Sequence, residues 1–206
     1  RLVFLADDNL TAYRSRCKEL LEAIAWWRRD KRMDFVSQVS IDVTRDEEML
    51  RMMVAAGVSQ VFVGIETPNV ESLRETGKRQ NMKVDLAKEV QKLIDYGISV
   101  MGGMIVGFDA DGPETFRAQY DFAMKTPVPM FSLGALIASD STPLKERIIR
   151  EGRLAELADT VQGVPWASNI VPAGMTTQQL DSGLQHLSNS LYAPDAFAER
   201  MVNFIE

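Results

Sequence analysis

QVFVGI (Gln60–Ile65) and ISVMGGMIVGF (Ile98–Phe108) are two apolar segments on either side of a helical pattern over Leu86–Ile94. Both are rich in β-branched residues and nearly continuous in apolar character, as strands buried on both faces of a parallel sheet are. The residues between them repeat apolar side chains at helical spacing. This order of strand, helix and strand predicts a βα unit on a parallel sheet.

The alternation of strand and helix extends in both directions from this unit. We predict strands over the apolar runs at residues 2–6, 35–43, 60–65, 98–108 and 130–138, with helices between them. The chain is therefore of the α/β class, with parallel strands. Open doubly wound sheets and barrels both satisfy this pattern, and periodicity does not separate them.

The strand pattern stops after Gly152, which suggests a first unit over residues 1–152 and a helical C-terminal extension over 153–206. We expect the extension to hold one helix near 177–191 and another that starts near Pro194 and buries Phe197. Helix N-termini are indicated by capping patterns. These patterns are Thr44 with Glu47, Thr142 with Pro143, and Thr176 with Gln179.

Composition excludes several classes of site. The chain of 206 residues has one cysteine, Cys17, and one histidine, His186, so it holds no disulfide framework, Cys/His zinc site or iron–sulfur cluster by itself. The net charge of -6 argues against a nucleic-acid partner. The aromatic and basic run at residues 26–32 fits better as two core tryptophans followed by cations at a helix C-terminus.

No apolar run is long enough for a transmembrane segment, and the N-terminus lacks a signal-peptide pattern. We therefore expect a cytoplasmic location. The chain begins at Arg1, without a methionine and directly before a strand, so we expect a domain fragment. The first strand of an incomplete sheet has an unpaired edge, which predicts self-association there or marginal stability.

Acidic residues follow the predicted strands, at the sheet edge where α/β proteins bind ligands. Asp8, Asp42, Glu66 and Asp109 are the oxygen ligands of one alternative, a complete α/β-barrel enzyme that uses a divalent metal. Many such acids are instead helix N-caps. Glu66 fits that explanation poorly, because glutamate is a weak N-cap and Thr67-Pro68 follows it at once.

Glycines within the predicted strands, at positions 64, 102, 103 and 107, weaken a sheet unless something packs closely against the backbone. A bulky neighbouring side chain and a bound ligand both explain them. Neither a G-x-G-x-x-G pattern nor a Walker loop occurs, so the known phosphate-binding loops are not indicated.

Several strings, in this order, resemble the second part of the radical S-adenosylmethionine (SAM) domain in the cobalamin (B12)-binding subgroup. They are FLADDN (4–9), SQVSIDVT (37–44), G-I-E-T-P (64–68) with L-x-x-x-x-K-x-Q (73–80), and I-V-G-F-D-x-D (105–111). STPLKERIIREGRL (141–154) and LYAPDAFAERM (191–201) resemble the C-terminal extension of these proteins. The resemblance covers nearly the whole chain.

The resemblance implies a partial (β/α) TIM-like barrel fragment that binds SAM across the carboxyl ends of its strands. By analogy with the family, the cofactor-binding residues are Ser40 and Asp42 for the ribose, Gly64 and Glu66 beside the pocket, and Ile105, Val106 and Gly107 against the adenine. The resemblance identifies no catalytic residue and no metal ligand. Methyl transfer is the implied reaction, on a small-molecule or lipid-like substrate that the sequence does not identify.

The chain departs from the family in one large respect. Radical SAM chemistry needs a C-x-x-x-C-x-x-C loop for a 4Fe–4S cluster, and this chain has a single cysteine. We therefore expect a radical SAM enzyme fragment that is inactive alone, with cluster and cobalamin bound only in the full-length protein. Besides the metal enzyme, the remaining alternative is a non-catalytic binding module of the same fold.

Overall fold

The computed structural model describes residues 1–75, 85–155 and 167–205. They form one five-stranded sheet in the order β1-β2-β3-β4-β5, in which every neighbouring pair is parallel. The strands are β1 (Leu2–Leu5), β2 (Asp34–Val39), β3 (Val58–Glu66), β4 (Ser99–Val106) and β5 (Met130–Ala135). The prediction of a parallel α/β fold is confirmed, and the sheet is open rather than closed.

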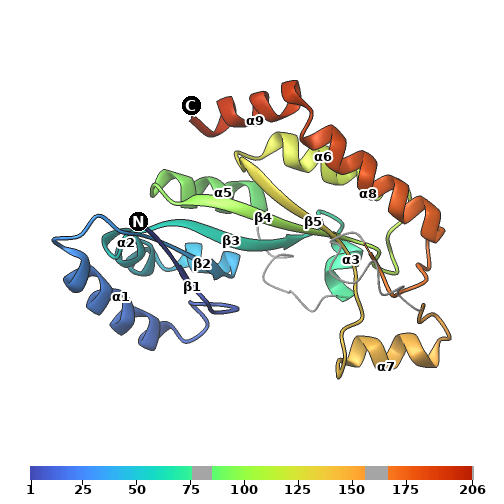
Figure 1. Ribbon diagram of the computed structural model, residues 1–206, viewed down its shortest axis with the longest axis horizontal. Coiled ribbons are helices and arrows are strands. Elements are labelled where there is room, and N and C mark those ends of the chain that lie inside the picture. The colour runs from blue at the N-terminus through green and yellow to red at the C-terminus, as the bar shows by residue number, and fades with distance from the viewer. Residues whose placement is uncertain (76–84, 156–166, 206) are drawn as a thin grey trace.

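Helices connect the strands and then continue beyond β5. They are α1 (Arg14–Arg28), the 3-10 helix η1 (Ile41–Arg45), α2 (Glu47–Ala55), α3 (Val70–Glu75), α5 (Leu86–Asp95), α6 (Thr115–Lys125), α7 (Pro143–Arg150), α8 (Thr177–Leu191) and α9 (Pro194–Ile205). Figure 1 shows α8 running beside α6 and α7 lying beyond the end of β5. The N-terminus lies at the edge strand β1 and the C-terminus at the end of α9 (Figure 1).

The two faces of the sheet differ because side chains alternate along each strand. In β3, Val61, Val63 and Ile65 are fully buried in the main core, which the helices also line. Phe62, between them, is only half-buried on the opposite face. The expectation that this strand is buried on both faces is therefore wrong, and the Phe62 face, opposite the main core, is available to form a site.

Helix α1 packs through a different stripe from the one that its tryptophans suggest. Cys17 and Leu21 are its buried residues, whereas Trp26 is 66% exposed and Trp27 is 45% exposed. The prediction of two core tryptophans is wrong. The side chains of Arg29 and Lys31 lie over the two indole rings, at 4.7 and 4.2 Å from the ring centroids, so the rings are covered by cations instead of core atoms.

The end of β2 also differs from the prediction. The strand stops at Val39, and Ile41 and Val43 are buried within η1 rather than in a longer strand. Helix α2 is capped by Asp46, whose carboxylate accepts a hydrogen bond from the Met49 N–H at 3.0 Å. The capping box at Thr44 is therefore wrong.

The C-terminal helices begin where the sequence predicts. The Thr142 side chain caps α7, and Thr176 with Gln179 forms the capping box of α8. Phe197 of α9 is only half-buried, so its expected burial is wrong, and the buried residue of α9 is Arg200. Leu187 of α8 belongs to the core that the sheet helps to form. The division at residue 152 stays a prediction.

Candidate functional site

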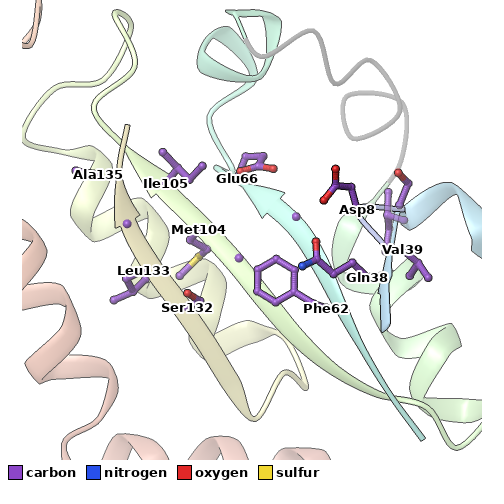
Figure 2. A pocket seen from close by; sticks show the side chains of 15 residues that line it. Asp8, Gln38, Val39, Phe62, Glu66, Met104, Ile105, Ser132, Leu133 and Ala135 are labelled. Carbon is purple, nitrogen blue, oxygen red and sulfur yellow. The ribbon is translucent and has the colours of Figure 1, made fainter. Parts of the chain in front are cut away.

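A cavity of about 410 Å³ lies on the Phe62 face of the sheet, opposite the main core, toward the carboxyl ends of the strands. Figure 2 shows its side chains spread across neighbouring strands. The lining residues are Asp8, Gln38, Val39, Ser40, Ile41, Phe62, Gly64, Glu66, Gly103, Met104, Ile105, Ser132, Leu133, Gly134 and Ala135. Its size is within the range of small-molecule and cofactor sites.

Glycine and apolar positions shape the centre of this cavity. Phe62 and Gly64 line it from β3, Gly103 and Ile105 from β4, and Gly134 from β5. A glycine has no side chain to fill the space above its strand, so a ligand can approach the backbone closely at these positions. The floor of the cavity is therefore mainly strand backbone and apolar surface.

Glu66 ends β3 in an unusual conformation. Its φ is +67°, in the left-handed region that side-chain-bearing residues rarely adopt. The pairing of β3 with β4 shifts register between Gly64 and Glu66, so one extra residue is accommodated there. Glu66 is 8% exposed and lines the cavity. The interpretation of Glu66 as more than a helix cap agrees with this geometry.

Ser40 lies directly after β2 and lines the cavity. Asn9, from the loop after β1, makes two hydrogen bonds to Ser40. The Asn9 Nδ2 donates to Ser40 Oγ at 2.9 Å, and the Ser40 N–H donates to Asn9 Oδ1 at 3.3 Å. The sequence offered no signal for this role of Asn9, since the contact joins residues far apart along the chain.

Asp42 does not lie with Ser40. It belongs to η1, where its Oδ2 accepts a hydrogen bond from Arg14 Nη2 at 3.0 Å, and it is absent from the described lining of the cavity. The expectation that it closes a strand failed because η1 turns the chain away after Ser40. Its assignment to a ribose stays an untested prediction that this position does not support.

The segment Ile105–Gly107, predicted to contact the adenine, lies partly in the cavity and partly in the core. Ile105 lines the cavity, whereas Val106 is fully buried against Leu180 and Leu184 of α8. Gly107 has a φ of +112°, which glycine tolerates. Only Ile105 of this segment therefore presents its side chain to a ligand in the cavity.

Polar lining residues that the sequence analysis missed are Gln38 in β2 and Ser132 in β5. Ser132 interrupts an otherwise apolar strand, whereas Gln38 follows Ser37 in a more polar one. Alternation places both on the face of the sheet opposite the main core. These polar residues within predicted strands were the signal in the sequence for a lining role. It was not decisive, since a polar residue on a strand is more often exposed to solvent.

The buried carboxylate of Asp111 holds the backbone turn that follows β4; this turn is the corner beside the cavity. Asp111 is 1% exposed, and its Oδ2 accepts hydrogen bonds from the N–H groups of Gly107 at 2.9 Å and Phe108 at 3.1 Å. Its Oδ1 accepts one from Ser72 Oγ at 2.6 Å, so α3 is tied to the loop after β4. Burial raises the pKa of Asp111, although these hydrogen bonds act to lower it.

Asp109 has a different environment. Burial acts to raise the pKa of its carboxyl, but hydrogen bonds from Arg153 and Arg147 outweigh burial and lower the pKa. Two arginines therefore form ion pairs with the Asp109 carboxylate, and Arg14 forms one with the Asp42 carboxylate. Over residues 1–75, 85–155 and 167–205, no three histidine, cysteine or acidic side chains gather as a metal site. The ligand set of the divalent-metal alternative is thus not assembled in the described chain.

Comparison with known proteins gives matches along most of the chain. Residues 142–206 match a protein family described as "Domain of unknown function (DUF4070)". Hopanoid C-2 methylase of Rhodopseudomonas palustris (strain TIE-1) is 32% identical over 154 residues, which are 74% of this chain and 29% of that protein. An uncharacterized methyltransferase of Synechocystis sp. is 35% identical over 158 residues, which are 76% of this chain and 30% of that protein.

A solved structure matches as well. It is the radical SAM methyltransferase TsrM from Kitasatospora setae, with cobalamin and a 4Fe–4S cluster bound. The TM-score is 0.60 at 24% identity, and the match covers 73% of this chain and 28% of that one. This likeness shows that the two share a fold. Among the described residues, no helix is long and apolar enough to cross a membrane.

The Lys78 and Gln80 positions of the L-x-x-x-x-K-x-Q string lie outside the described residues. Elsewhere, the relatives and the shared fold confirm the resemblance to radical SAM enzymes of the cobalamin-binding type. The chain spans only 29% and 30% of the length of the two curated relatives.

Proposed function

We propose, from this confirmed resemblance to radical SAM methyltransferases, that the chain forms the SAM-binding wall of such an enzyme and that the reaction is methyl transfer. The observation that carries the proposal is the cavity at the strand ends, where Ser40, Gly64, Glu66 and Ile105 come together. They are four of the residues for which the resemblance implies cofactor contact. The substrate remains a small molecule or a lipid-like compound that these residues do not specify.

The chemistry of the lining suits SAM. The charged residues in the described lining, Asp8 and Glu66, are both acidic, which favours a ligand that carries a sulfonium cation. The Ser40 hydroxyl, oriented by Asn9, is available to a ribose hydroxyl, and Ile105 offers an apolar contact to an adenine face. When bound, SAM would supply the methyl group or the 5′-deoxyadenosyl radical.

The chain does not fit a 4Fe–4S cluster. Such a cluster needs several thiolates, and the sequence contains one cysteine. Cys17 is 3% exposed in α1, and burial, together with the nearby charge of Asp7, raises the pKa of its thiol. We infer that cluster ligands and cobalamin come from other parts of a longer protein, and that these 206 residues alone do not cleave SAM.

Calorimetric titration with SAM and with uncharged S-adenosylhomocysteine tests the proposal. We expect saturable binding of both, with SAM tighter by about threefold to tenfold because of the nearby carboxylates. Glu66→Gln should reduce that preference, whereas Glu22→Gln, on the exposed side of α1, should leave it unchanged. Absence of saturable binding, or micromolar affinity for Mn²⁺ without affinity for either adenosyl compound, would overturn the proposal.

The gene provides an independent test of the missing cluster ligands. The codons that precede Arg1 should encode a C-x-x-x-C-x-x-C segment, and their absence would favour a non-catalytic binding module. For the 206-residue chain by itself, we also propose that β1 mediates self-association, since it is an edge of the described sheet and Leu2 and Phe4 are exposed. Light scattering should show concentration-dependent growth in mass, and a stable monomer would contradict this.

A further inference from the structure

Gln119 of α6 lies beneath the cavity and is fully buried. Its Nε2 donates a hydrogen bond to the carbonyl oxygen of Ile105 at 2.8 Å, and lies 3.5 Å from the carbonyl oxygen of Glu66 as a second, weaker contact. One side-chain amide therefore contacts the ends of both β3 and β4, at the two residues that line the cavity from those ends.

This contact occurs where the backbone ladder is irregular. The pairing of β3 with β4 shifts between Gly64 and Glu66, and Glu66 has its φ in the left-handed region. Two carbonyl oxygens that face the same space repel each other unless a donor lies between them. An amide NH₂ group has two hydrogens and no net charge, so it satisfies both carbonyls without the cost of burying a cation.

The orientation of the amide follows from the same chemistry. A flipped amide would direct its oxygen at two carbonyl oxygens, which is repulsive, so Nε2 must face the strand ends. The Oε1 atom then points elsewhere, and it has no hydrogen-bond partner among the residues that the structure describes. A residue that only filled space would avoid this cost, since an apolar side chain of similar length leaves no polar atom unpaired.

We propose that Gln119 is a positioning residue that sets the spacing of the β3 and β4 ends and thereby the shape of the cavity. It acts through Glu66 and Ile105 and does not line the cavity itself. The effect of Gln119 on ligand affinity rests on the proposed function, in which the ligand of the cavity is an adenosyl compound. Its effect on the strand ends does not depend on any ligand.

Two substitutions separate this role from simple packing. Gln119→Met keeps the length of the side chain but removes the donor. Gln119→Glu is an acceptor when ionised and regains a donor only when it is protonated. Gln91→Met is the matched control, because Gln91 lies on the exposed side of α5, where its Nε2 contacts Asp95 at 2.8 Å.

Hydrogen exchange measured by mass spectrometry gives the ligand-independent readout. In Gln119→Met we expect exchange to accelerate about fivefold to tenfold at the amides of Gly107, Phe108 and Leu136. This factor corresponds to the loss of one net hydrogen bond. The remaining core amides and the Gln91→Met control should keep wild-type rates. In Gln119→Glu the same amides should be protected at low pH and lose protection as the pH rises.

Affinity for S-adenosylhomocysteine should fall by a similar factor in Gln119→Met. Unchanged local exchange, or faster exchange throughout the core, would overturn the positioning role. Should Gln119→Met fail to fold, the pH dependence of Gln119→Glu decides alone, and a pH-independent profile would overturn it. If the wild-type protein binds no adenosyl compound but Gln119→Met still shows the localised acceleration of exchange, the proposed function is overturned and the positioning role is supported.

Discussion

Replacing Asp111 tests whether the corner beside the cavity depends on one buried carboxylate. Alanine at this position removes the acceptor for the buried N–H groups of Gly107 and Phe108. Each buried donor left without a partner costs about 1–3 kcal/mol. We therefore expect Asp111→Ala to lower the free energy of unfolding by about 2–6 kcal/mol, which is a large part of the stability of a typical domain.

Asparagine should behave differently from alanine. Its carbonyl oxygen can accept the same two N–H bonds, and its NH₂ can donate to Ser72 Oγ. It also lacks the charge whose burial raises the pKa of Asp111 above the ordinary 3.8. A raised pKa means that stability contributed by the protonated acid is present below pH 3.8 and is lost as pH rises through the folded-state pKa. At pH 7, the free energy of unfolding of Asp111→Asn should thus exceed that of wild type.

Urea unfolding followed by circular dichroism, from pH 4 to pH 8, measures these differences. The informative quantity is the gap between wild type and Asp111→Asn. It should narrow as the pH falls through the raised folded-state pKa of Asp111, because the wild-type acid is then increasingly protonated. Equal destabilisation by asparagine and alanine at pH 7 would refute the reasoning, as would a gap that does not change with pH.

Three further predictions concern other sites. Gly102→Ala should lower the free energy of unfolding by about 1–3 kcal/mol in urea titrations, because the added Cβ would lie 2.8 Å from Phe131 and 2.9 Å from Ile65. Thr176→Ala removes half of a capping box and should cost about 1 kcal/mol in the same assay. Asp109→Asn should weaken the acid-dependent loss of stability, since a lowered pKa contributes stability that is present above pH 3.8 and is lost as pH falls below it. Circular dichroism during an acid titration checks this last case.

Local signals in the sequence predicted most of the fold. The β-rich runs identified all the strands of the described sheet, since a buried parallel strand is apolar almost throughout. Capping residues predicted the starts of α7 and α8, because a cap is a bond between neighbours in sequence. The run at Ile41 and Val43 failed for a physical reason. A buried helical turn and a strand both need apolar residues, and a short run does not distinguish them.

Local patterns in the sequence could not show that the tryptophans of α1 are exposed. Trp27 lies on an apolar stripe with Leu20, but the neighbouring stripe through Cys17 and Leu21 also has helical spacing. Which stripe faces the sheet depends on where the sheet ends, and that is a tertiary property. The exposed position of Trp26 follows from the same choice.

The candidate site was predictable only in part. Ser40 and Glu66 were found because polar residues at strand ends meet at one edge of a parallel sheet. Asn9 and Gln119 were missed because each acts on backbone or side chains that are distant in sequence. Sequence pattern indicates which residues face a site, whereas the residues that hold them in place require the packed structure.

The I-V-G-F-D-x-D string shows what such a motif encodes. Of its residues, Ile105 alone is in the described cavity lining. Gly107 allows the backbone to turn at a φ of +112°, and Asp111 binds the amides of that turn. Asp109 joins the turn to Arg153, beyond α7. The motif that supported the resemblance thus specifies mainly the geometry of a corner. Substitutions at its acidic positions should therefore change ligand affinity through the position of Ile105 and not through a lost ligand contact.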